Sequence, residues 1–100
     1  MKKKYAFLLM GNQYDILKHK AEFETESQIS YIFTVKNLEE AIQCAVNCLH
    51  NGVGAIELCG AFGKDGAEEI IKATQNKIAV GYVVHNSEQD ILFDKFFSDF

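Results

Sequence analysis

The fold of this chain is decided by residues 52–85, which read GVGAIELCGAFGKDGAEEIIKATQNKIAVGYVVH. Short apolar runs at 53–59 and 78–84 predict two strands, and the segment between them has the apolar spacing of a helix after a glycine-rich loop. A strand–helix–strand unit implies parallel strands joined by a right-handed crossover. Glu57 and Cys59 lie on its first strand and His85 ends its second, so the unit also carries side chains capable of chemistry.

The preceding half of the chain continues this alternation. The apolar run at 5–10 predicts a buried first strand; it follows three lysines like a signal peptide but lacks a small-residue cleavage site. Residues 29–35 are rich in β-branched and aromatic side chains and predict the second main strand. Asn37 with Glu40 forms a capping-box pattern that starts a helix, and Gly52 is suited to follow its end.

Two segments are less regular. Residues 13–28 favour either a short helical turn around 14–17 or an edge strand at 21–25. Ser87 opens a last helix, whose apolar side chains are Leu92, Phe93, Phe96, Phe97 and Phe100.

Strict alternation of strands and helices predicts one α/β domain over residues 1–100, with a mainly parallel sheet of four or five strands and βαβ crossovers. We expect a flavodoxin-like open sheet with helices on both faces, in three layers. The alternative is a half-barrel that pairs with a second copy. The chain has no proline and no low-complexity tract that would mark a linker.

Composition narrows the classes of function. The net charge of −4 and the absence of arginine argue against a nucleic acid or an anionic membrane as partner. The three cysteines are not a disulfide framework, and they indicate reduced thiols in a cytoplasmic protein. Cys44 and Cys48 share a helix, with Cys48 off the apolar stripe, and no further ligands have the spacing of a zinc site. No metal is expected, and the sequence identifies no cofactor.

Four long motifs carry a resemblance to a known family: KKYAFLLMG at 3–11, YIFTVKNLEEA at 31–41, GVGAIELCGAFGKDGA at 52–67 and KIAVGYVVH at 77–85. On these motifs the chain resembles a family of small bacterial proteins classified only as a domain of unknown function. This resemblance implies no activity and no functional residues. Residues 52–85 are also similar to two βα units of an aldolase-type barrel, although neither strand has a lysine that could form a Schiff base.

The carboxyl ends of parallel strands are the usual place for a ligand, which directs attention to four loops at one sheet edge. The loop at 60–66 leads into a helix and offers glycine backbone N–H groups and one lysine to an anion. Its alternative reading is a plain strand-to-helix turn, with Asp65 capping the helix. The candidate ligand-binding residues at this edge are Gly11, Asn12, Gly60, Phe62, Gly63, Lys64 and Asn86. For Phe62, a flap over a ligand, a partner anchor and a core contact all stay open.

Three residues are candidates for catalysis. Glu57 lies on a strand expected to be buried, so it would need a partner such as Lys36, or it would act as an acid or base with a raised pKa. If their strands are neighbours, Cys59 and His85 could form an activated nucleophile. Each also has a structural reading, as a hydrogen-bonded group or core filler. Whether the protein is an enzyme stays open.

Two functions therefore compete. The first is binding of a small, possibly anionic, molecule at the carboxyl edge of the sheet. The second is a non-catalytic homodimeric assembly module, because a domain of this size may not cover all of Phe93, Phe96, Phe97 and Phe100.

Overall fold

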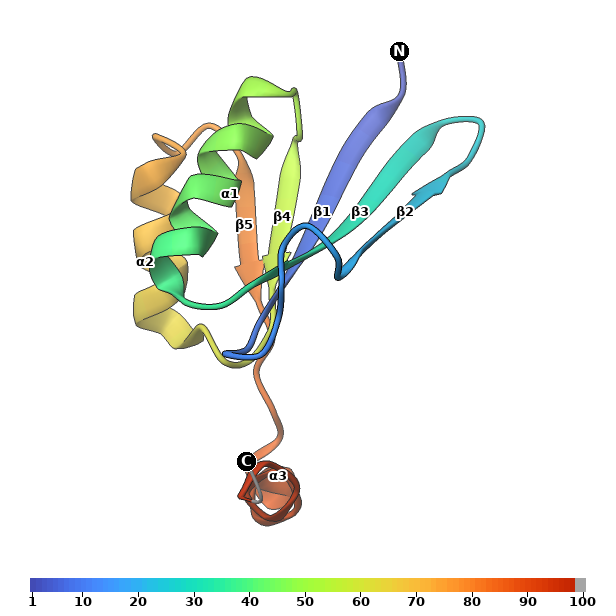
Figure 1. The fold of residues 1–100 in the computed structure, drawn as a ribbon. Helices are drawn as coiled ribbons and strands as arrows, with labels where there is room; N and C mark the ends of the chain where they lie inside the picture. The colour runs from blue at the N-terminus through green and yellow to red at the C-terminus, as the bar shows by residue number, and fades with distance from the viewer. Residues whose placement is uncertain (99–100) are drawn as a thin grey trace.

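The computed structural model describes residues 1–98 and contains one five-stranded sheet (Figure 1). Its strands are β1 (Lys3–Met10), β2 (Lys20–Glu24), β3 (Gln28–Val35), β4 (Ala55–Leu58) and β5 (Ala79–Tyr82). The spatial order is β2-β3-β1-β4-β5, and only β2 runs antiparallel to its neighbour. The predicted open, mainly parallel sheet with βαβ crossovers is confirmed, and the sheet does not close into a barrel.

Two helices form the second layer: α1 (Leu38–His50) and α2 (Gly63–Ala73). Both lie on the same face of the sheet in Figure 1. The connections from β3 to β4 and from β4 to β5 step across the sheet in one direction, so right-handed crossovers must put both helices on one side. The expected third layer is therefore wrong: in residues 1–98 no helix covers the opposite face, and the domain has two layers.

The core lies between the sheet and these two helices. Ala6 and Leu8 of β1 point toward the helices and are fully buried, as are Ile56 and Leu58 of β4 and Ile70 of α2. On α1 the buried residues are Ala41, Cys44, Ala45 and Cys48. The expectation that Cys48 lies off the buried stripe is therefore wrong, because α1 is rotated so that both of its thiols face inward.

The start of α1 follows the predicted capping pattern. Asn37 Oδ1 accepts a hydrogen bond from the Glu40 N–H at 2.9 Å, and Glu40 Oε1 accepts one from the Lys36 N–H at 2.8 Å. The start of α2 differs from the prediction. This helix begins at Gly63, directly after the buried Phe62, so Asp65 lies within the first turn instead of capping it.

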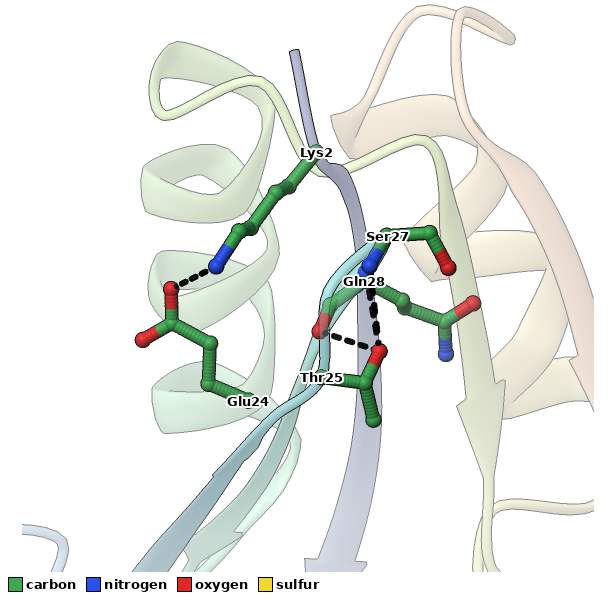
Figure 2. Close-up of polar contacts among 5 residues, drawn as sticks. All are labelled: Lys2, Glu24, Thr25, Ser27 and Gln28. Atoms are coloured by element: carbon green, nitrogen blue, oxygen red, sulfur yellow. Dashed lines mark hydrogen bonds and ion pairs between the residues drawn. The ribbon is translucent and has the colours of Figure 1, made fainter.

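Residues 13–28 contain both predicted alternatives, a turn at 15–18 and then the edge strand β2. The tight β2–β3 connection is held by Thr25, whose side-chain oxygen accepts the backbone N–H groups of Ser27 and Gln28 at 3.3 and 3.1 Å (Figure 2). Lys2 pairs with Glu24 beside it. The β2–β3 hairpin thus extends the sheet beyond the area that the helices cover (Figure 1).

The last described element leaves the body of the domain. The C-terminal arm, residues 83–98, contains the 3-10 turn η1 (Ser87–Gln89) and the helix α3 (Asp90–Phe97). It lies beyond the carboxyl edge of the sheet, away from both layers (Figure 1). Phe100, which the sequence analysis grouped with this helix, lies outside the described residues. Among residues 1–98 no helix is long and apolar enough to cross a membrane.

Candidate functional site

The carboxyl edge of the sheet brings Gly60 and His85 together. The Val83 N–H donates to the Leu58 carbonyl at 2.9 Å, which extends the β4–β5 pairing past the strand ends. A Cβ added to Gly60 would lie 3.3 Å from His85 Nε2, so the imidazole rests against the backbone of the glycine loop. Cys59 directly follows β4 and His85 lies after β5. These two strands are neighbours in the sheet, as a Cys59–His85 pair would require.

Cys59 is held by the neighbouring strand. Its sulfur accepts a hydrogen bond from the Met10 N–H at 3.3 Å, and its side chain packs against the hydrophobic core. Within residues 1–98 no hydrogen bond joins Cys59 to His85. The thiol therefore has a structural partner at the end of β1.

His85 faces the arm as well as the sheet edge. Its ring stacks on Phe93 with centroids 3.6 Å apart and an angle of 7° between the planes. Because Phe93 lies on α3, this stack links the arm to the carboxyl edge. His85 is thus positioned between the glycine loop and an aromatic side chain, with much of its surface still exposed.

Glu57 lies on the face of the sheet that no described helix covers. The expectation of a buried Glu57 paired with Lys36 is wrong: Glu57 is exposed, and its Oε1 accepts a hydrogen bond from the Tyr5 hydroxyl at 2.7 Å. A Cβ at Gly81 would lie 3.9 Å from the same carboxylate. Burial, the hydrogen bond to Glu57 and the charge of Glu57 together raise the pKa of Tyr5 to about 12.

The glycine loop is partly filled by its own side chains. Phe62 is buried in the core against Gly66, where an added Cβ would lie 3.1 Å from Phe62 Cβ. Of the three readings open for Phe62, the core contact is therefore the one observed. Gly63 has a φ of +63°, which a side chain would strain.

The other ligand-binding candidates are scattered around the edge. Lys64, Asn12 and Asn86 are exposed. Gly11 is covered by the ring of Tyr14, which an added Cβ would meet at 3.0 Å. The structure thus groups Cys59, Gly60 and His85 at one edge and puts Glu57 on the uncovered face.

A hollow that the sequence did not reveal lies on the other face of the sheet, between α1 and the β2–β3 hairpin. This α1 groove has a volume of about 580 Å³. Its apolar lining includes Ile16, Leu17, Tyr31, Phe33, Cys44, Cys48 and Val53. Alternation along β3 shows that Tyr31 and Phe33 share a face, but only the position of α1 shows that they line a groove beside this helix.

Of the two thiols in the α1 groove, Cys44 is not reactive in the manner of a nucleophile. The hydrogen bond with Cys48, and then burial, raises the pKa of Cys44, which keeps this thiol protonated. In residues 1–98 no group of three or more His, Cys, Asp and Glu side chains could hold a metal ion. The groove is therefore a surface for apolar contact, not a metal centre.

Fold and site together define a two-layer α/β domain with one uncovered sheet face and an exposed apolar arm. The chain belongs to a family described as a family of unknown function, DUF6506, whose model matches residues 3–98. The family resemblance of its motifs is thus confirmed, while the similarity to aldolase-type barrels stays a prediction. No curated protein and no solved structure matches the chain.

Proposed function

We propose that this protein is a homodimeric interaction module, in which a second copy covers the C-terminal arm. The observation that carries this proposal is the exposure of α3, which has no buried residue along its length. Ile91 is 78% exposed and Leu92 is 60% exposed. The helix packs mainly against η1 and His85, so its apolar side chains make little contact with the body of the domain.

The uncovered face of the sheet is a second surface that no helix of residues 1–98 covers. The strand register lines up Phe7, Ile32 and Glu57 across this face, opposite the side that carries Ala6 and Leu8. Mainly parallel sheets are normally covered on both faces, because their strands are apolar on both sides. The exposed apolar side chains of α3 mark an interaction surface, and a two-fold pair of identical chains is the commonest way to bury such a patch.

Analytical ultracentrifugation tests the dimer directly. We expect wild-type protein at micromolar concentration to sediment at twice the 11.3 kDa mass of the chain. Leu92→Glu puts a charge into the proposed interface and should raise the dimer dissociation constant by about a hundredfold, in the range of a strong interface residue.

Lys72→Gln is the matched control, since it changes net charge by the same amount at an exposed site on α2. Wild-type protein that stays monomeric at high micromolar concentration contradicts the proposal. Equal weakening by both variants would mean that net charge, and not α3, controls association.

A second candidate function is binding of a small anionic molecule at the carboxyl edge. The observation that favours it is the contact of His85 with Gly60, beside the loop that leads into α2. Backbone N–H groups at the start of a helix attract an anion, and an imidazole N–H can donate a further hydrogen bond to it. The same edge holds Cys59, but the arrangement does not define a reaction.

This candidate is tested by following the amide signals of residues 60–66 by NMR during titration with inorganic phosphate and small carboxylates. His85→Ala should abolish the saturable shifts and leave the melting temperature nearly unchanged. Shifts that persist in the variant, or a large loss of stability with binding intact, would assign His85 a structural role.

We also infer a cytoplasmic location. Cys44, Cys48 and Cys59 are all free thiols, two of them buried, as expected for a protein kept in a reducing compartment.

A further inference from the structure

The helix layer of this domain leaves part of the sheet uncovered. Helices α1 and α2 pack on each other; α1 lies over β1 and β3 and α2 lies over β5, whereas β2 lies past α1. On this side of the hairpin, Tyr31 and Phe33 stack on one another with centroids 5.2 Å apart and line the α1 groove. The groove therefore occupies the place where a third helix of the layer would lie.

The helix that packs on neither layer of the domain is α3. Its eight residues span about 12 Å at the usual rise of 1.5 Å per residue. That length fits along a groove bordered by α1, which is itself 13 residues long. The groove offers Leu17 and the rings of Tyr31 and Phe33, and α3 offers Ile91 and Leu92.

We propose that α3 of a second copy docks into the α1 groove, between α1 and the β2–β3 hairpin. This inference rests on the proposed homodimer and specifies where its arms bind. The exchange is reciprocal: each copy supplies its own α3 and receives that of its partner. Such an exchange closes with two-fold symmetry and leaves no arm free to recruit a third chain.

The charges on the two surfaces are complementary. The groove carries Lys4, Lys20 and Glu40, two positive charges and one negative, and α3 carries Asp90, Asp94 and Lys95, two negative charges and one positive. Lys20 has no carboxylate partner among residues 1–98, while Lys4 donates to the Asn51 carbonyl at 2.9 Å and keeps further N–H groups. Charge pairs of this kind contribute to the register and specificity of docking more than to its affinity.

Chain length disfavours docking of α3 into its own groove. Three strand spacings separate β5 from β3, which is roughly 14 Å at the usual spacing. Residues 83–86 precede η1 and span at most about 14 Å when fully extended, which leaves no length for a detour. They would also have to pass around α2 and α1, which lie between β5 and the groove on that face. A partner's arm approaches without this restriction.

Disulfide capture between two separately tagged variants tests the docking position. Leu17→Cys marks the groove, Leu92→Cys marks α3, and Phe23→Cys marks the uncovered face of the same hairpin. All three sites are well exposed, so the substitutions should leave the fold intact. Because each chain carries one new cysteine, a disulfide between the two tags can only join different chains.

Under mild oxidation we expect the Leu17→Cys and Leu92→Cys chains to cross-link at least tenfold faster than the Phe23→Cys and Leu92→Cys chains. A mixture of wild-type protein and the Leu92→Cys variant measures how much cross-linking the native thiols produce. If ultracentrifugation shows a dimer but the two pairs of variants cross-link at similar rates, the docking position is wrong and the homodimer is still supported. Absence of a dimer overturns both.

Discussion

The body of this domain and its C-terminal arm are both rich in apolar residues but differ in what they bury. In the body, Leu8, Ile56 and Ile70 are completely buried between sheet and helices. In the arm, no residue of η1 or α3 is buried. Apolar content thus shows that a segment needs a packing partner, but not whether the partner belongs to the same chain.

The largest expected contrast comes from removing one apolar side chain from each region. Leu8→Ala should lower the free energy of unfolding by about 3 kcal/mol, because it opens a cavity in a packed core. Ile91→Ala, at a site that is 78% exposed, should change it by less than about 0.5 kcal/mol in the monomer.

Urea denaturation at protein concentrations below the dimer dissociation constant measures both effects. Similar losses for the two variants would mean that the arm packs on the body of its own chain, and would remove the contrast between the regions.

Helix capping provides a contrast of intermediate size. Asn37 caps α1 through its side chain, so Asn37→Ala should cost about 1 kcal/mol of stability. Gln89 precedes α3 without a side-chain capping bond, and Gln89→Ala should have little effect. Thermal denaturation of the two variants beside wild type measures the difference. An equal cost at the two positions would show that the start of α3 is held by contacts beyond its own cap.

The smallest expected effect concerns the pKa of Tyr5, on the face of the sheet that no described helix covers. The pKa of Tyr5 is raised from 10.0 to about 12, so the folded state holds its proton more tightly than the unfolded chain. The stabilisation is fully present below pH 10 and is lost as the pH rises from 10 to 12. Tyr5→Phe should therefore reduce the loss of unfolding free energy between pH 10 and pH 12. Urea denaturation at a series of pH values measures this loss.

Glu57→Gln is the companion variant, since it removes the charge that contributes to the raised pKa of Tyr5. Tyrosine absorbance near 295 nm should then report a lower pKa for Tyr5. An unchanged titration in this variant would mean that burial alone raises the value.

Much of the architecture was predictable because it depends on local patterns. The apolar runs predicted β1, β3, β4 and β5, and the Asn37–Glu40 pattern predicted the start of α1. The start of α2 was missed, because the burial of Phe62 in the core decides where that helix begins. The exposure of Glu57 was missed for a related reason: it depends on which face of the sheet the helices cover.

The periodicity and turn residues of the chain were sufficient for the four main strands, their parallel pairing and the sheet edge that bears Cys59, Gly60 and His85. The number of layers, the Tyr5–Glu57 pair and the α1 groove depend on the strand order β2-β3-β1-β4-β5. That order comes from contacts between residues far apart in the chain, and it sends both crossovers in one direction. Both helices therefore cover one face, which leaves the other face and α3 exposed.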